Sequence, residues 1–289
     1  MAGKLPVSPL APASFPDLPR IGGVRFASVA AGVRYQGRSD VMLAVMDPGT
    51  SIAGVFTRSS TRAAPVLDCQ DKVGGDSASG AAILVNSGNA NAFTGHRGQT
   101  SVETITAALA DVTGLPQARI FTASTGVIGE PLKHDRITAK LAELHRALDA
   151  DAIESAAQAI MTTDTFAKGA MAEVQIDGQT IQIAGIAKGS GMIAPDMATM
   201  LVYIFTDARH DQTALQALLG SICDRTFNCI TVDSDTSTSD SLMCCATGAA
   251  GVDATGDPGF AAALEAVMLD LAHQVVRDGE GATKFVEIR

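Results

Sequence analysis

Short apolar runs that alternate with amphipathic stretches restrict this chain to a layered fold of strands and helices. Residues 41–45 and 200–205 are apolar throughout, and segments this short suit buried strands. Residues 211–224 instead carry apolar side chains at helical spacing. The alternation contains no strand–turn–helix dinucleotide fingerprint. It therefore predicts an α/β fold, with α+β as the alternative, in which layered β-sheets are flanked by helices.

The same patterns predict the other elements. A hairpin is expected around Asp177-Gly178-Gln179, because the runs on both sides alternate apolar and polar residues. The last helix should begin at Pro258 with Asp257 as its N-cap and end before Gly279. Further strands are expected at 54–56, 82–85, 172–176, 180–186 and 229–232, a strand entering a turn at 120–129, a polar loop at 86–91, and helices at 101–112, 135–148 and 152–161.

The overall composition argues against several classes of function. The chain has 289 residues, of which 46% are hydrophobic and 18% charged, so it can bury a substantial core. Its formal net charge of −10 argues against general binding to nucleic acid, whose phosphates pair with Lys and Arg. No apolar run approaches the roughly 18 residues of a membrane span, and the first residues lack the pattern of a targeting signal. We expect a cytoplasmic protein that binds neither nucleic acid nor membrane.

The cysteines, histidines and aspartates form no recognisable metal site in the sequence. None of the five cysteines lies in a Cys-x-x-Cys pair, and the histidines lack zinc spacing. The neighbours Cys244 and Cys245 should point to opposite faces of a strand. Residues 233–237 (DSDTS) lack the glycine and glutamate of an EF-hand loop, and we interpret them as a polar turn. We expect buried, reduced thiols, no metal and no cofactor.

The bond between Ala198 and Thr199 is a candidate site of self-cleavage. A glycine-rich stretch that begins at Lys188 precedes it, and an apolar strand follows. A threonine hydroxyl can attack the carbonyl before it, and hydrolysis of the resulting ester leaves the threonine as a new N-terminus. The released α-amine has a reference pKa of about 7.7–8.0, low enough to accept the hydroxyl proton near neutral pH. The structural alternative is a flexible loop followed by a β-forming threonine.

Residues 188–201 (KGSGMIAPDMATML) resemble the self-processing segment of the ornithine acetyltransferases of arginine biosynthesis, also called bifunctional glutamate N-acetyltransferases. The agreement continues in the same order from about residue 25 to the end of the chain. The other matching segments are 31–33 (AGV), 53–57 (AGVFT), 85–92 (VNSGNANA), 123–129 (ASTGVIG), 161–165 (MTTDT), 227–228 (FN), 230–233 (ITVD), 235–238 (DTST) and 277–284 (RDGEGATK). The chain is therefore identified as similar to this family over nearly its whole length.

The resemblance implies an acetyl transfer in two steps. N-acetylornithine would acetylate the hydroxyl of Thr199 and release ornithine, and glutamate would then take the acetyl group. Some members of the family also accept acetyl-CoA as donor. Thr125 and Gly126 correspond to the side chain and the backbone N–H that stabilise the oxyanion. The family's substrate contacts correspond to Thr162, Lys188, Thr199 and Glu280.

These contacts suit a zwitterionic substrate. Lys188 can pair with a carboxylate, and Glu280 can pair with an ammonium group. The residues alone leave plainer interpretations open, because Ser124-Thr125-Gly126 also suits a turn and both charges also suit solvated loops. Spacing does not separate Thr162 from its neighbour Thr163.

The resemblance also divides the chain into three segments. Residues 1–24, with prolines at positions 6, 9, 12, 16 and 19, would form an extended lead-in. Residues 25–198 would form the first cleavage product with the oxyanion loop, and residues 199–289 the second. The two products would stay associated and pair into a heterotetramer.

The sequence departs from the family at two places. Asp196 stands where the family usually has asparagine, beside the scissile bond. The chain ends at Arg289, whereas the family continues through a region that adds an asparagine and a Ser or Thr to the substrate site. A fragment and a shortened protein both fit this ending. Two other functions stay open, a non-catalytic amino-acid-binding remnant and an amidohydrolase or aminopeptidase with the same N-terminal threonine chemistry.

Overall fold

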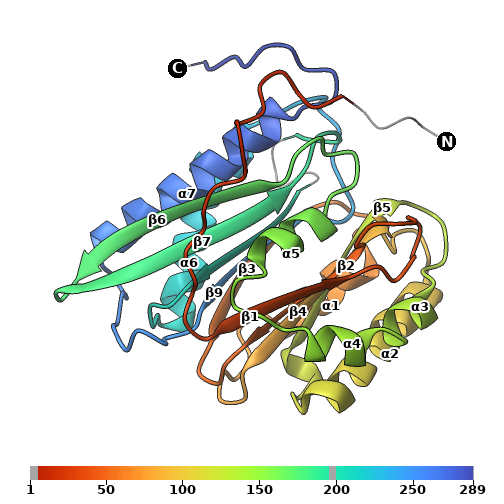
Figure 1. Cartoon of the computed structure of the whole chain (residues 1–289), viewed down its shortest axis with the longest axis horizontal. Helices are drawn as coiled ribbons and strands as arrows, with labels where there is room; N and C mark the ends of the chain where they lie inside the picture. Colours follow the sequence, from red (N-terminus) through yellow and green to blue (C-terminus); the bar gives the residue numbers. More distant parts are fainter. Residues whose placement is uncertain (1–5, 195–199, 289) are drawn as a thin grey trace.

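Two β-sheets packed face to face form the centre of the molecule, and helices cover both outer faces (Figure 1). The computed structural model describes residues 6–194 and 200–288. The first sheet has the order β1 (Val24–Val29), β2 (Val41–Met46), β4 (Ala81–Asn89), β5 (Ile120–Val127). The second has the order β3 (Ser51–Phe56), β9 (Ser241–Ala246), β8 (Leu201–Thr206), β7 (Gln179–Lys188), β6 (Lys168–Ile176). The predicted layering of sheets and helices is confirmed.

Two parallel strand pairs bring several strand ends to one edge of the sandwich. β4 and β5 run parallel and are joined by α2 (His96–Thr113). β8 and β9 also run parallel and are joined by α6 (Gln212–Arg225). The remaining strand pairs among the described residues are antiparallel, including the predicted hairpin β6–β7 and the pair β7–β8.

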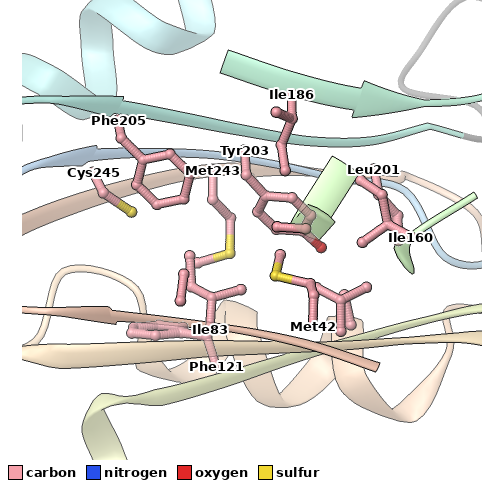
Figure 2. Packing of buried hydrophobic residues seen from close by; sticks show 14 of the residues in the cluster. Met42, Ile83, Phe121, Ile160, Ile186, Leu201, Tyr203, Phe205, Met243 and Cys245 are labelled. Carbon is pink, nitrogen blue, oxygen red and sulfur yellow. The ribbon is translucent and has the colours of Figure 1, made fainter. Parts of the chain in front are cut away.

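Large apolar side chains from both sheets fill the space between them (Figure 2). Met42, Ile83 and Phe121 of the first sheet meet Tyr203 and Phe205 of the second, and all five are almost completely buried. This continuous apolar layer fixes the two sheets against each other, because burying such side chains is the main favourable contribution to folding. The predicted opposite orientations of Cys244 and Cys245 are confirmed, since the latter lies in this layer and the former lies under the outer helices.

The outer layers consist of helices with one apolar side. α6 and α7 (Pro258–Arg277) cover the second sheet, and α2, α3 (His134–Thr138) and α4 (Leu141–Arg146) cover the first. Two further helices, α1 (Ala64–Lys72) and α5 (Ile153–Ala159), flank the space between the sheets. Asp257 caps α7 as predicted, with its carboxylate 2.7 Å from the N–H nitrogen of Phe260.

Helix α7 is long and apolar enough to meet the length and composition test for a membrane span. In the fold it packs instead along β6 and β7, with Leu264, Val267 and Leu271 buried in the layer over the sheet. Its hydrophobicity is therefore explained by a place in the core.

Residues 6–23 contain no helix or strand. The Ser8 hydroxyl donates to the carbonyl of Arg277 at the end of α7, at 2.6 Å, and the Ser8 N–H donates to Thr165 at 2.9 Å. Further along, Phe15 lies close against Gly169 of β6. The segment thus runs from the end of α7 past β6 to the start of β1.

Four predictions about local structure are wrong. The strand expected at 229–232 is instead a 3-10 turn (Phe227–Cys229) followed by an irregular segment, joined to Ile193 by a backbone bond from Val232. The loop expected at 86–91 belongs to β4 as far as Asn89, because side-chain bonds satisfy its buried amides. The helix expected at 135–148 is interrupted where Lys140 bonds to the carbonyl three residues earlier. Four of the five thiols are buried as expected, but Cys229 is exposed.

Candidate active site

The candidate residues meet where β5 and β7 end and β8 begins. Lys188, the last residue of β7, pairs in register with Leu201, the first residue of β8. Residues 189–200 connect these two neighbouring strands, so the predicted cleavage point lies within this connection in the sequence. Ala198, Thr199 and Asp196 themselves lie outside the described residues.

A cavity of about 430 Å³ opens at this edge. Residues from both sheets and from several connecting segments line it. Among them are the predicted Thr125, Gly126, Thr162, Lys188 and Glu280, together with Arg34, Tyr35, Thr163, Gly191, Met192, Asp233, Asp235, Ser237, Thr238 and Ser239. The structure therefore brings together every predicted site residue that it describes.

Thr125 and Gly126 lie at the carboxyl end of β5. Gly126 has φ of +130°, and a Cβ atom there would lie 2.3 Å from the carbonyl carbon of Gly88 in the neighbouring strand β4. Only glycine fits this conformation and this close approach. The hydroxyl oxygen of Thr125 accepts a 3.2 Å hydrogen bond from the ammonium group of Lys188, which links the two sheets at the cavity.

Lys188 is a buried cation, with 3% of the residue exposed. Burial lowers the pKa of Lys188, and the nearby carboxylates of Asp164, Asp240 and Asp278 oppose this effect. In its protonated form, Lys188 places a positive charge at the cavity wall. The arrangement suits the binding of an anionic group.

Asp164 and Asp278 enclose a second buried lysine, Lys168 of β6. The Lys168 nitrogen lies 2.7 Å from Asp164 and 2.5 Å from Asp278, and all three side chains are completely buried. Burial alone would raise the pKa of Asp164, but the charges of Lys168 and Lys188 hold it well below the usual range. Asp164 is therefore a permanent anion behind the cavity.

Thr162, Thr163 and Glu280 also line the cavity. Glu280 is exposed, and its N–H donates to the carbonyl of Ser190 at 2.7 Å. The Thr163 hydroxyl lies 2.6 Å from the Ser190 hydroxyl, whereas Thr162 is half-buried at the cavity wall. Both threonines therefore line the cavity, and the Thr163 hydroxyl also bonds to the connection that follows β7.

Two aspartates hold the described ends of the connection between β7 and β8. Asp233 accepts hydrogen bonds from the N–H groups of Met192 and Ile193, at 2.5 and 2.8 Å. Asp240 accepts from the N–H of Met200 at 2.7 Å. Residues 233–237 thus form a polar turn at the cavity, with a carboxylate that binds backbone. Within residues 6–194 and 200–288, no group of three or more His, Cys, Asp or Glu could hold a metal ion.

Arg34 and Tyr35 line the cavity but were not predicted as site residues. They follow a loop at 31–33 whose three N–H groups donate to the buried carboxylate of Asp40, at 2.7 to 3.2 Å. The loop is one of the segments that match the family, but the sequence gives no sign that Asp40 organises it. Asp164, Lys168 and Asp278 were not predicted either. Asp164 and Lys168 lie only four residues apart, but the third member, Asp278, lies 110 residues from Lys168.

Comparison with known proteins identifies the family. Residues 25–289 match the ArgJ family. The chain belongs to the ArgJ family. A relative from Ruegeria pomeroyi, named arginine biosynthesis bifunctional protein ArgJ, is 75% identical over 289 residues, which are all of this chain and 71% of that relative. The prediction of an arginine-biosynthesis enzyme is confirmed.

Solved structures agree with this assignment. The ornithine acetyltransferase of Mycobacterium tuberculosis, solved in complex with ornithine, is 32% identical with a TM-score of 0.54, over 62% of this chain and 93% of that chain. An L-aminopeptidase D-Ala-esterase/amidase from Ochrobactrum anthropi, a variant of the Ntn-hydrolase fold, has a TM-score of 0.54 at 9% identity, over 94% of this chain and 88% of that chain. The second likeness concerns the fold alone, and it extends across both sheets.

Proposed function

We propose that this ArgJ-family protein cleaves itself between Ala198 and Thr199 and then transfers an acetyl group from N-acetylornithine to glutamate through acetyl-Thr199. One observation carries the proposal. The hydroxyl of Thr125, bonded to Lys188 and next to Gly126, faces a cavity at the strand ends that bracket Thr199 in the sequence. Acetyl-CoA is a further candidate donor.

Self-cleavage uses the Thr199 hydroxyl as nucleophile. Its oxygen attacks the carbonyl carbon of Ala198, and the amide nitrogen leaves with a proton as the α-amine of Thr199. Water then hydrolyses the ester, which gives a carboxylate at Ala198 and a free hydroxyl on Thr199. The new α-amine serves as the base for the next reaction, because its reference pKa of about 7.7–8.0 lies near neutrality.

Transfer follows in two acyl-exchange steps. The α-amine takes the hydroxyl proton while the oxygen attacks the acetyl carbon of N-acetylornithine, and ornithine leaves with that proton on its nitrogen. The amine of glutamate then attacks the acetyl ester, and Thr199 regains its proton. The Thr125 hydroxyl and the Gly126 N–H would stabilise the oxyanion in each step, a contribution worth about 10²–10³ in turnover per donor.

The charges at the cavity suit both amino-acid substrates. Lys188 would bind the α-carboxylate that ornithine and glutamate share. Glu280 would bind an ammonium group, and Thr162 would add a polar contact. A buried lysine and an exposed glutamate that line the same small cavity are complementary to a zwitterion.

The two cleavage products would remain together. β8 lies between β7 and β9 in the second sheet, so strands from both sides of the cleavage point share one hydrogen-bonded sheet. Cleavage would thus remove a loop connection without removing this pairing. Assembly into a heterotetramer and location in the cytoplasm belong to the same proposal.

An acetyl-transfer assay tests the proposed activity. The protein is incubated with N-acetylornithine labelled in the acetyl group, with and without glutamate. The proposal predicts labelled N-acetylglutamate that appears only with glutamate. Release of labelled acetate at a rate that glutamate does not change would indicate a hydrolase, and absence of both products would indicate a non-catalytic remnant.

A further inference from the structure

We propose that Asp164 is a positioning residue that holds the substrate-binding lysine and threonine in place from behind the cavity. The inference rests on the proposed function, because it concerns the same substrate site. Asp164 itself does not line the acyl-transfer cavity. It acts on the substrate through Lys188 and Thr162.

The contacts of Asp164 reach both sides of this site. One carboxylate oxygen accepts a hydrogen bond of 2.6 Å from the N–H of Gly189, the residue that follows Lys188. The other accepts from the N–H of Thr162 at 2.9 Å. A single buried carboxylate therefore fixes the distance between the end of β7 and the loop that carries Thr162.

A third contact pairs the buried carboxylate of Asp164 with a positive charge. The first oxygen also accepts from Lys168 at 2.7 Å. Three donors thus converge on two carboxylate oxygens, and the carboxylate itself is completely buried. An asparagine has one acceptor oxygen and an NH₂ group that would face one of these donors, so a neutral isostere does not fit the site.

The electrostatic surroundings of Lys188 combine three carboxylates with a second lysine. The groups that face it are the Thr125 hydroxyl of β5, Lys168 of β6, and the carboxylates of Asp164, Asp240 and Asp278. The two lysines repel each other, and burial already favours the neutral form of Lys188. Loss of Asp164 would favour deprotonation of Lys188 further, so binding of a carboxylate would fail at a lower pH than in the wild type.

Asp278 offers a matched control. It also pairs with Lys168, at 2.5 Å, and is completely buried. The other hydrogen bonds of its carboxylate are with Thr165, not with Gly189 or Thr162. Asp278→Asn therefore removes a negative charge beside Lys168. It leaves in place the hydrogen bonds from Gly189 and Thr162 to Asp164.

The experiment measures glutamate binding by titration calorimetry across pH 6 to 9 for the wild type, Asp164→Asn and Asp278→Asn. We expect Asp164→Asn to weaken binding at least about tenfold at pH 7, with a steeper loss as pH rises. Asp278→Asn should lose clearly less affinity for glutamate than Asp164→Asn does. Equal losses in both variants, or wild-type affinity and pH profile in Asp164→Asn, would overturn the proposal.

A second variant covers the case in which Asp164→Asn does not fold. Asp164→Glu keeps the charge but displaces the carboxylate by one methylene. It should bind glutamate more weakly than the wild type with an unchanged pH profile, and wild-type affinity would overturn the positioning role. If the wild type binds no glutamate, the proposed function itself fails, whereas normal wild-type binding with unaffected variants contradicts only this inference.

Discussion

The Thr125 hydroxyl is the side chain that the proposed mechanism assigns to the oxyanion. It lies at the cavity and accepts a hydrogen bond from Lys188. We expect Thr125→Ala to lower kcat by about 10²–10³ with little change in KM, because the contact forms only with the developing charge. Steady-state kinetics of acetyl transfer measure this.

Thr122→Ala is the matched control on the same strand. Thr122 is buried in β5, and its hydroxyl has no hydrogen-bond partner among the described residues. Its removal should leave kcat unchanged. A similar loss in both variants would mean that Thr125 acts through the packing of β5.

Lys188→Ala should mainly weaken substrate binding. The lysine is the buried cation at the cavity, and a bound carboxylate would lose its counter-ion. We expect KM for glutamate to rise at least about tenfold at neutral pH. Since burial lowers the pKa of Lys188, wild-type affinity should also fall as pH rises through that pKa. An unchanged saturation curve in the variant would contradict the assignment.

At this scale, the sequence predicted five of the residues that line the cavity, but neither Arg34 and Tyr35 beside them nor the carboxylates behind them. Thr125, Gly126, Thr162, Lys188 and Glu280 came from motifs that are continuous in the chain. The supporting carboxylates bind partners up to 113 residues away. Such pairs have no local pattern, so only the fold discloses them.

At the scale of single elements, the burial of a cysteine within its helix or strand determines how reactive its thiol is. Burial raises the pKa of Cys69, Cys223 and Cys244 to about 12, and raises that of Cys245 well above its usual value. Cys229 follows α6 and is exposed. We expect a thiol reagent at pH 8 to label Cys229 alone in the folded protein and all five cysteines after denaturation. Rapid labelling of a strand cysteine would contradict the packing.

Helix α6 also protects the edge of the second sheet. The side-chain amides of Gln212 and Gln216 each donate to and accept from the backbone of edge strand β3, at Ile52 and Gly54 respectively, with distances of 2.7 to 2.9 Å. These bonds occupy backbone groups that would otherwise be open to another strand.

Replacing both glutamines with alanine should lower the free energy of unfolding by about 1–3 kcal/mol and increase self-association, because backbone groups lose their partners. Denaturant unfolding and light scattering measure the two effects. Gln99→Ala, at an exposed position of α2, is the control and should change neither. Unaltered stability in the double variant would show that water replaces the glutamines without cost.

Most elements could be predicted from apolar spacing, and the errors have local causes. Residues 137, 141 and 144 are buried at helical spacing, so the break between α3 and α4 leaves no mark on the pattern. The polar end of β4 looks like a loop because its amides are satisfied by distant groups, such as the Ser124 hydroxyl on β5. Local composition shows which side chains are polar, but it does not show which hydrogen-bond partners they have in the fold.

At the scale of the whole molecule, the order of strands links the fold to the proposed processing. The second sheet takes β3, β6 and β7 from before residue 199 and β8 and β9 from after it. The chain therefore folds as one unit and would be cut afterwards, at a connection whose described ends Asp233 and Asp240 hold. This arrangement allows a bond to break without loss of the core.

The most direct test of the central claim is intact-mass spectrometry under denaturing conditions after incubation with N-acetylornithine and no glutamate. The account predicts two pieces, one ending at Ala198 and one beginning at Thr199, with one acetyl group on Thr199 of the second piece that disappears when glutamate is added. It also predicts that Thr199→Ala stays in one piece and carries no acetyl group. Cleavage of the variant at the same bond, or an acetyl group on a residue other than Thr199 in the wild type, would contradict it.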